Sequence, residues 1–166
     1  MRGPAKPVAH IDDVPVRELA HGEKFAAQLG RIGPLVGMEQ LGCMLTVVPP
    51  GKRAFPRHNH HAIEEAIVIL EGEGEYRLGN ETHAVRAGHV MAAPAGGQET
   101  AHQLVNTGTG DLKYLCFSTQ QGIDIVEYPD SGKMAAAHWS HPDAESPEFV
   151  LRTYVGESVD YWEGEE

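Results

Sequence analysis

The chain has 166 residues, 41% of them hydrophobic, and its 24 acidic and 13 basic residues give a formal net charge of −11. This length suits one domain with its own core, and the ordinary apolar share argues against a disordered or fibrous protein. The negative charge repels phosphate backbones, so we expect no nucleic-acid partner, and no apolar run approaches the roughly 18 residues of a membrane helix.

Residues 1–40 are predicted to form an N-terminal extension. Its first 16 residues contain no continuous apolar stretch like that of a secretory signal peptide, so the expected location is the cytoplasm. The segment VRELAHGEKFAAQLGRIG (16–33) predicts one or two short helical turns that end at the breakers between Gly30 and Pro34.

The middle of the chain, residues 41–128, predicts an all-β core. Short segments rich in β-branched and aromatic residues recur about every ten residues, a spacing typical of a β-sandwich or barrel. Turn sequences such as EGEG, LGN and NTGTGD separate them. Cys43 and Cys116 lie in apolar segments and are expected to be small buried hydrophobes. The expected strands cover residues 43–48, 65–70, 74–78, 82–86, 89–93, 102–106, 112–118 and 122–128.

The C-terminal part, residues 129–166, is predicted to hold an irregular surface excursion over 129–149 and a strand over 149–155 that returns to the sheet. Within the excursion, His138 and His141 have no further ligand-capable partners nearby in sequence, so we interpret them as surface residues. The whole chain is expected to be one domain.

The stretch RHNHHAIEEAIVILEG (57–72) concentrates ligand-capable side chains in front of an apolar strand. Residues two apart on a strand share a face, so His58 and His60 can converge on one metal ion. Glu65 follows on the face shared by Ile67 and Ile69. His102, at the start of a later strand, is the fourth predicted ligand.

Alternatives to this ligand set remain open. His61 has the wrong parity and is expected to face solvent, and Glu64 points away if Glu65 points inward, although a slip of one residue would exchange them. Glu99 could replace His102 or add a second carboxylate near the site. Three imidazoles and one carboxylate suit a divalent transition metal such as Mn, Fe, Ni or Zn.

Basic residues gather in GKRAFPR (51–57), which contains Lys52, Arg53 and Arg57. Beside a metal they could steer an anionic substrate. The favoured interpretation is that Arg57, which alternates with His58, faces away from the pocket and forms salt bridges.

Two motifs resemble those of the cupin superfamily. The first has two histidines separated by one residue and then a glutamate between glycines, and the second ends in a histidine and an asparagine. The matching residues are Gly51, His58, His60, Glu65 and Gly72 in the first motif, and Gly88, Pro94, Gly96, His102 and Asn106 in the second.

This resemblance implies a double-stranded β-helix, the jelly-roll barrel of cupins, and a metal-dependent isomerase, epimerase, decarboxylase or dioxygenase acting on a small anionic molecule. The alternative is a small-molecule binding or sensor protein without turnover. No catalytic acid or base stands out in the sequence. Because the segments AIVIL and YLCF are apolar on both faces, we also expect a homodimer in which a second subunit covers one barrel face.

Overall fold

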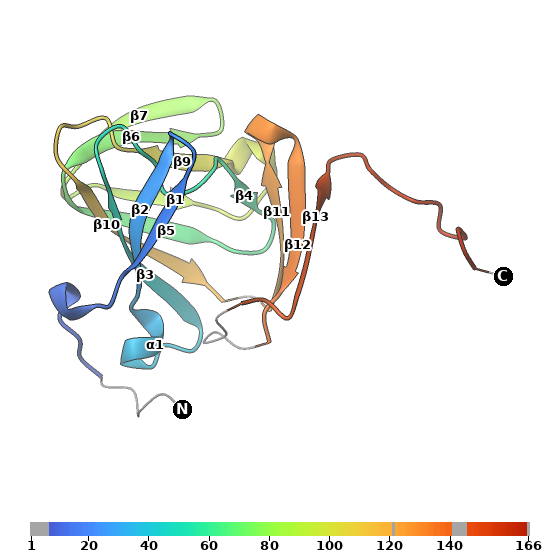
Figure 1. Ribbon diagram of the computed structural model, residues 1–166, viewed down its shortest axis with the longest axis horizontal. Helices are drawn as coiled ribbons and strands as arrows, with labels where there is room; N and C mark the ends of the chain where they lie inside the picture. Colours follow the sequence, from blue (N-terminus) through green and yellow to red (C-terminus); the bar gives the residue numbers. More distant parts are fainter. Residues whose placement is uncertain (1–6, 121, 141–145, 166) are drawn as a thin grey trace.

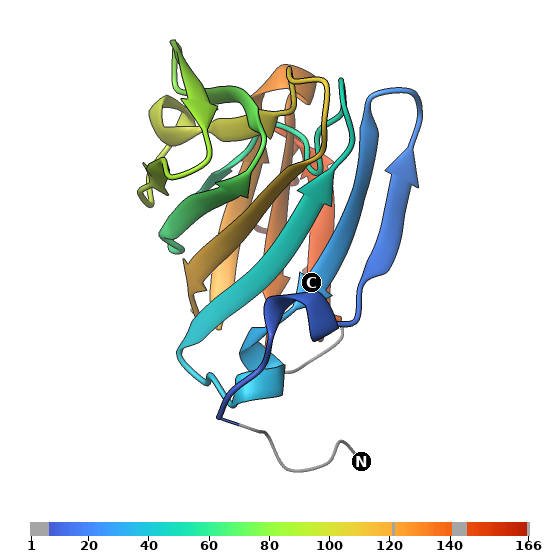
Figure 2. The same cartoon turned by 90° about the vertical axis from the view of Figure 1, so that its left-hand side faces the viewer.

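Two walls of antiparallel strands make up the computed structural model, which describes residues 7–120, 122–140 and 146–165. One wall is the sheet β1-β2-β3-β10-β5-β8, and the other consists of the sheets β7-β6-β9 and β13-β12-β11-β4. Figure 2 shows β1, β2, β3 and β10 side by side in front of β11 and β12. The predicted all-β fold class, the double-stranded β-helix of the cupins, is confirmed.

The elements are as follows. The strands are β1 (Arg17–His21), β2 (Phe25–Arg31), β3 (Leu41–Val48), β4 (Asn59–His60), β5 (Glu65–Glu71), β6 (Glu73–Leu78), β7 (Glu81–Arg86), β8 (Val90–Ala93), β9 (His102–Val105), β10 (Leu112–Thr119), β11 (Ile123–Tyr128), β12 (Lys133–His138) and β13 (Phe149–Tyr154). The short helical turns are η1 (Ile11–Asp13), α1 (Gly33–Val36), η2 (Gln98–Thr100) and η3 (Pro129–Ser131).

All eight strands expected between residues 43 and 128 are present, because the spacing of turn residues marked their ends well. Gly72, for example, separates β5 from β6 with a positive φ of 83°. A Cβ atom there would lie 2.4 Å from the carbonyl oxygen of Asp111, so only glycine fits this turn. β4, which is only two residues long, was not among the predicted strands.

The helical prediction for residues 16–33 is wrong. This segment forms the hairpin β1–β2, which turns at Gly22, and β2 pairs with β3. Ala27 and Leu29 point into the core from alternate positions of β2, so pairing with a neighbouring strand overrides the helix-forming composition of the segment. The single turn α1 lies where the predicted helix was expected to end.

The irregular excursion predicted for residues 129–149 is also wrong in part. After η3, Gly132 turns the chain at φ 65°, and β12 returns antiparallel to β11. Its sequence KMAAAH lacks the β-branched residues that usually indicate a strand. The predicted strand at residues 149–155 is present as β13, which pairs with β12. His141 lies outside the described residues.

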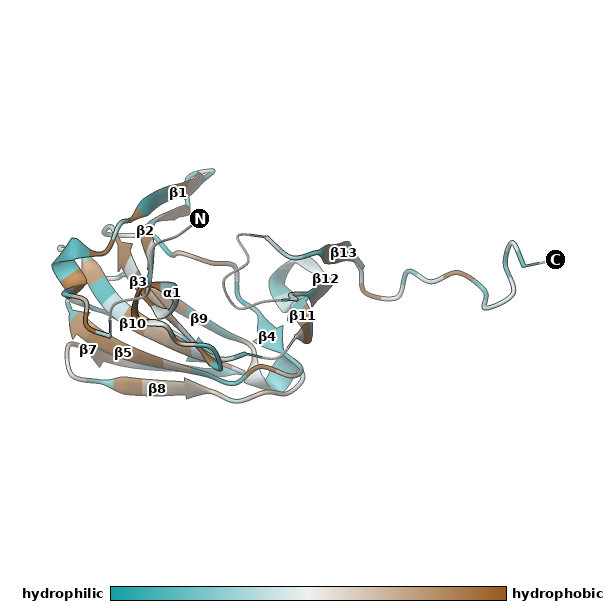
Figure 3. Ribbon diagram, turned by 90° about the horizontal axis from the view of Figure 1, so that it is seen from below, coloured by the Kyte–Doolittle hydropathy of each residue, from teal (hydrophilic) through white to brown (hydrophobic). Residues whose placement is uncertain are grey.

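The core lies between the two walls. Its fully buried side chains include Ile69 on β5, Val48 on β3 and Leu112 on β10, and hydrophobic residues gather along β3 and β5 (Figure 3). Leu115 and Phe117 point from β10 to the opposite side, where residues of the N-terminal segment line the same apolar pocket. The second apolar face of YLCF is therefore covered by the chain itself.

Candidate metal centre

The two sheets of the second wall meet at His58 and His102. The backbone N–H of His58 donates to the carbonyl of His102 at 3.1 Å, and the N–H of His102 donates back at 2.8 Å. β4 therefore lies between β9 and β11, as Figure 1 shows. This pairing brings residues about forty positions apart in sequence to the same point of the barrel.

His60 is oriented by a buried carboxylate on β11. Its Nδ1 donates to Asp124 Oδ2 at 2.5 Å, and Asp124 Oδ1 accepts a second hydrogen bond from the backbone N–H of Ala62 at 3.0 Å. Burial disfavours the charged imidazole, but the Asp124 hydrogen bond and the Glu65 charge outweigh it and raise the pKa of His60. The other ring nitrogen, Nε2, is buried and has no hydrogen-bond partner.

His58 is held in the same tautomer. Its Nδ1 lies 2.8 Å from the carbonyl oxygen of Pro56, and because a carbonyl only accepts, Nδ1 carries the proton. Nε2 is then left with a free lone pair. Burial, together with the nearby His102 and His60, lowers the pKa of His58 to about 4, so the ring is neutral at pH 7.

Glu65 opens β5 and shares its inward face with Ile67 and Ile69, as predicted from their parity. Its Oε2 accepts a hydrogen bond from His102 Nε2 at 2.9 Å, and its Oε1 lies 3.6 Å from the thiol of Cys116. Burial opposes ionisation of Glu65, but the His102 hydrogen bond and the charges of the surrounding imidazoles hold its pKa at about 2. Glu65 is therefore a carboxylate at pH 7.

His58, His60 and Glu65 offer ligand atoms that all lie within 4.8 Å of one another. His102 adjoins this group through Glu65. Adjacent ligands about 2.1 Å from one ion, at a right angle, would be about 3.0 Å apart, close to the 2.9 Å between His102 Nε2 and Glu65 Oε2. These residues thus fit a divalent transition metal, while the place of His102 in the set remains a prediction.

The alternative ligands lie elsewhere. Glu64 is exposed, and its backbone N–H bonds to Thr119. Glu99 is an exposed residue of η2 that accepts a hydrogen bond from the backbone of Gly97 at 3.0 Å. His61 is 42% exposed and lies 3.6 Å from Glu127, as expected for a residue that faces away.

The basic residues of GKRAFPR are also engaged away from the centre. Arg57 pairs with Asp130 at 3.2 Å and donates to the carbonyl of Gly79 at 2.6 Å. The predicted salt bridge is present, but the Arg57 side chain is only 12% exposed and does not extend into solvent. Lys52 donates to the Glu23 carbonyl, and Arg53 lies over the ring of Phe25.

Asp124 was not predicted as a site residue from the sequence. The segment GIDIVEY was predicted only as a strand; in the structure Asp124 is 3% exposed and points inward, whereas Ile123 and Ile125 face outward. A lone acidic residue between two isoleucines on a strand was the available signal.

Asn106, which belongs to the second motif, has a structural role. Its side-chain amide donates to the carbonyls of Val48 at 2.7 Å and Gly110 at 2.8 Å, and its oxygen accepts from the N–H of Gly108 at 2.9 Å. Asn106 is fully buried and joins the end of β3 to the turn before β10. It does not contact the candidate ligands through any of these bonds.

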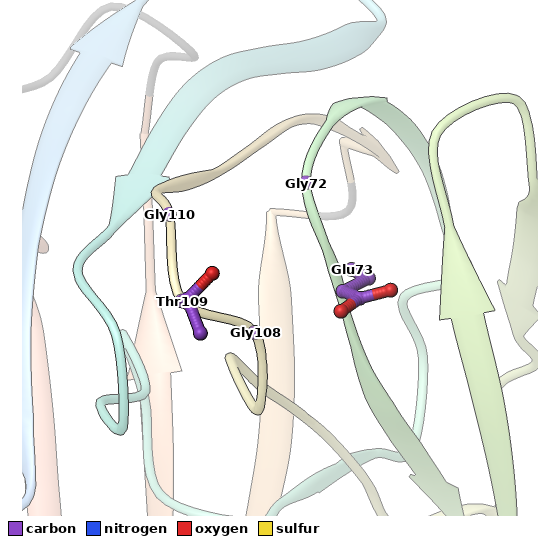
Figure 4. Close-up of a pocket in the computed structure, with 5 residues that line it drawn as sticks. All are labelled: Gly72, Glu73, Gly108, Thr109 and Gly110. Atoms are coloured by element: carbon purple, nitrogen blue, oxygen red, sulfur yellow. The ribbon is translucent and has the colours of Figure 1, made fainter.

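A surface pocket at the other end of β5 is separate from this centre. Gly72, Glu73 and residues 108–110 line it, and it encloses about 330 Å³ (Figure 4). Glu65 and Gly72 are separated by the length of β5, roughly 23 Å at about 3.3 Å per residue. Glu73 is the only titratable residue of this pocket, so it offers no group of ligands.

Comparison with known proteins agrees with the fold and the motifs. The cupin-domain model matches residues 44–118. The chain belongs to the cupin superfamily. This cupin is 34% identical over 131 residues to auxin-binding protein 1 of Arabidopsis thaliana, a match that covers 74% of the chain and 64% of the relative. The chain thus spans less than two thirds of the length of that curated relative.

Solved structures similar to this cupin include two described as sugar phosphate isomerases. A candidate sugar phosphate isomerase of Acidithiobacillus ferrooxidans is 26% identical with a TM-score of 0.72, and the match covers 79% of this chain and 86% of that one. A sugar phosphate isomerase of Silicibacter pomeroyi, from the cupin superfamily, is 22% identical with a TM-score of 0.76 over 93% and 98% of the two chains. The second likeness supports the fold.

None of the helices among the described residues of the cupin is long and apolar enough to cross a membrane.

Proposed function

We propose that this cupin is a metal-dependent enzyme that acts on a small anionic molecule. In this proposal His58, His60, Glu65 and His102 hold one divalent transition metal ion, of the Mn, Fe, Ni or Zn kind. When bound, such an ion polarises a carbonyl or carboxylate oxygen of the substrate. The residues of the chain hold the ligands in place, exclude water from the core side and orient the substrate.

The observation that carries this proposal is the hydrogen bonding of the ring nitrogens of His58 and His60, the two histidines on either side of Asn59. Both Nδ1 atoms are hydrogen-bonded, to Pro56 and Asp124, and the buried Nε2 of His60 has no hydrogen-bond partner, with Glu65 Oε2 3.8 Å away. Leaving a buried polar atom unpaired costs about 1–3 kcal/mol, so this arrangement favours a ligand that accepts the lone pair. The adjacent Glu65 carboxylate supplies a negative charge.

Within this class, sugar phosphate isomerisation or epimerisation is the first reaction to test. The likeness at 26% identity to a candidate sugar phosphate isomerase supports it. Decarboxylation or dioxygenation of a keto acid or carboxylate uses the same kind of centre and belongs to the same proposal.

The test has two steps. Protein purified without chelators or an affinity tag is first analysed for metal, and about one ion per chain is expected. The metal-loaded protein is then incubated with sugar phosphates, keto acids and diketones, and products are followed by NMR. Absence of metal, after loading with each of the four ions, would contradict the proposed centre.

A second candidate function is binding of a small molecule without turnover. It is favoured by the relative at 34% identity, whose name describes a binding protein. Calorimetric binding of a compound from the same panel, with no product formed by the metal-loaded protein, would support this function over catalysis.

A further inference from the structure

Two cationic side chains share a face of the sheet β4-β11-β12-β13 with the residue that orients His60. Asp124, Val126 and Tyr128 alternate along β11, and the Asp124 side chain bonds to His60, so their common face is turned toward the candidate metal centre. Lys133 pairs directly with Tyr128 in the β11–β12 register. Lys133 therefore lies on this face as well.

Arg152 occupies the same face one strand further out. It pairs with Ala135 of β12, and Ala135 pairs in turn with Val126 of β11. Directly paired residues project to the same side of a sheet. β11, β12 and β13 stand side by side in Figure 1, so the face runs from the centre toward β13.

Tyr128 connects these cations with the centre. Its ring centroid is 6.3 Å from that of His58, and Lys133 Nζ lies 5.7 Å from the Tyr128 ring centroid. Burial raises the pKa of Tyr128, and the positive charge of Arg152 opposes this rise. The Tyr128 ring thus lies next to the ring of the candidate ligand His58. Lys133 of β12 and Arg152 of β13 each bring a positive charge toward it.

Neither cation is neutralised by the part of the chain that the structure describes. Arg57 and Arg77 both pair with Asp130, at 3.2 and 3.3 Å, and Lys113 pairs with Asp12 at 3.1 Å. By contrast, no carboxylate oxygen of the described residues lies within 4.0 Å of a charged nitrogen of Lys133 or Arg152. In a chain with a net charge of −11, two such cations on the face turned toward the candidate metal centre favour an anionic ligand.

We propose that Tyr128, Lys133 and Arg152 form an anion-binding subsite for a carboxylate or phosphate group of the substrate. The guanidinium of Arg152 and the ammonium of Lys133 provide charge-assisted hydrogen bonds, and the Tyr128 hydroxyl donates another. The proposal rests on the proposed function, because the subsite would place the remainder of the substrate at the metal centre. It also assigns the substrate an anionic group in addition to its metal-binding oxygens.

The subsite is tested by NMR titration of ¹⁵N-labelled, metal-free protein with inorganic phosphate and, separately, with malonate. We expect saturable shifts at the amides of β11, β12 and β13 with at least one of the two anions. The double variant Lys133→Met/Arg152→Met should bind about tenfold more weakly, as expected for the loss of two exposed charges. Arg86→Met, which removes an exposed arginine from β7, is the matched control and should bind as the wild type does.

The titration results identify the anionic group of the substrate or overturn the subsite. Binding of phosphate alone would assign a phosphorylated substrate, and binding of malonate alone would assign a carboxylate. Shifts located elsewhere, no saturable shift with either anion, or equal affinity in the double variant and the wild type would overturn the subsite. Both side chains are exposed, and the single variants Lys133→Gln and Arg152→Gln, each expected to lose part of the affinity, serve if the double variant fails to fold.

The titration also separates this proposal from the proposed function. It uses metal-free protein, so a failure to bind metal leaves the anion result valid. Conversely, one metal ion per chain without any anion binding would retain the metal centre and overturn the subsite alone. Fructose 6-phosphate and fructose, compared in metal-loaded protein, then test whether the phosphate group contributes to affinity at the assembled site.

Discussion

His58 and His102 are paired through their backbones, and their imidazole rings lie 4.6 Å apart. The two main-chain hydrogen bonds between them do not depend on side-chain identity. We therefore expect this framework to survive replacement of the candidate ligand side chains, so that such variants lose metal without losing the fold.

The first prediction concerns His60. His60→Ala should remove most of the bound metal, since it deletes the buried Nε2 that has no hydrogen-bond partner. The measurement is the ratio of metal to protein by elemental analysis, with circular dichroism to verify folding. His61→Ala, which changes the exposed neighbour, should keep the wild-type ratio. An unchanged ratio in His60→Ala would show that the site is wrongly assigned.

Asp124 acts on the centre through His60. Asp124→Asn keeps the size of the side chain but weakens the hydrogen bond that fixes the His60 tautomer. Metal affinity should fall by about 10- to 100-fold, as is usual when the group orienting a ligand histidine is lost. Competition with a chromogenic chelator measures this affinity. The matched control is Glu127→Gln on the same strand, and equal losses in the two variants would refute a specific role for Asp124.

Asn106 should matter for stability. Asn106→Ala deletes three hydrogen bonds to backbone groups and leaves buried partners unpaired, so the free energy of unfolding should fall by about 3 kcal/mol. Urea denaturation gives this value. Asn80→Ala, at an exposed turn, should change it by less than about 0.5 kcal/mol. A small effect of Asn106→Ala would mean that the turn rearranges to satisfy its backbone.

The lowered pKa of His58 predicts an acid dependence of stability in the metal-free protein. The folded ring stays neutral down to about pH 4, whereas the unfolded ring takes up a proton below its ordinary pKa of 6.5. Protons therefore favour the unfolded state, and stability is lost as the pH falls from about 6.5 toward 4. Glu65, with its pKa held at about 2, adds a second loss below its ordinary value of 4.5.

His60 has a raised pKa and works in the opposite direction, so the effect of His58 is measured as a difference between two proteins. Between pH 7 and pH 5, wild type should lose about 2 kcal/mol relative to His58→Gln. Urea midpoints of both metal-free proteins at the two pH values provide the comparison. Parallel pH profiles would contradict the prediction.

The homodimer remains a prediction, but the structure suggests a different surface for it. The outer face of β11 and β13, opposite Asp124, exposes Ile123 (67%), Ile125 (40%), Phe149 (55%) and Leu151 (53%). β12 connects them in register, with Ala136 between Ile125 and Leu151. A contiguous exposed apolar face of this kind is typical of an interaction surface.

Light scattering at micromolar concentration should therefore give the mass of a dimer. Ile125→Asp/Leu151→Asp should give a monomer, whereas Val90→Asp, at an exposed apolar position of β8, should not. A monomeric wild type would refute the prediction, and a dimeric double variant would place the interface elsewhere.

The sequence predicted the all-β fold and the grouping of His58, His60 and Glu65, because turn spacing and strand parity are local signals. Glu65, Ile67 and Ile69 alternate along one strand, so parity predicted their common face, while the choice of Glu65 over Glu64 needed the structure. Asp124 could not be found in this way, because its inward direction follows from His60, a residue that is distant in sequence. The same holds for Lys133 and Arg152, which share a face only through the register of three strands.

The errors at the two ends of the barrel have a similar origin. The segments at residues 16–33 and 133–138 have the composition of helix or coil. They become strands because β3 and β11 offer them unpaired edges, a tertiary effect that outweighs local preference.

The proposed ligands come from all three sheets: Glu65 from the sheet of β5, His60 from that of β4, and His102 from that of β9. A cation bound there would cross-link the three sheets. Removing the ion with a chelator would then weaken the contacts between the sheets as well as the candidate metal centre, since ligand binding adds to folding stability by mass action. Amide exchange of β4 and β9 should accelerate together once the ion is withdrawn.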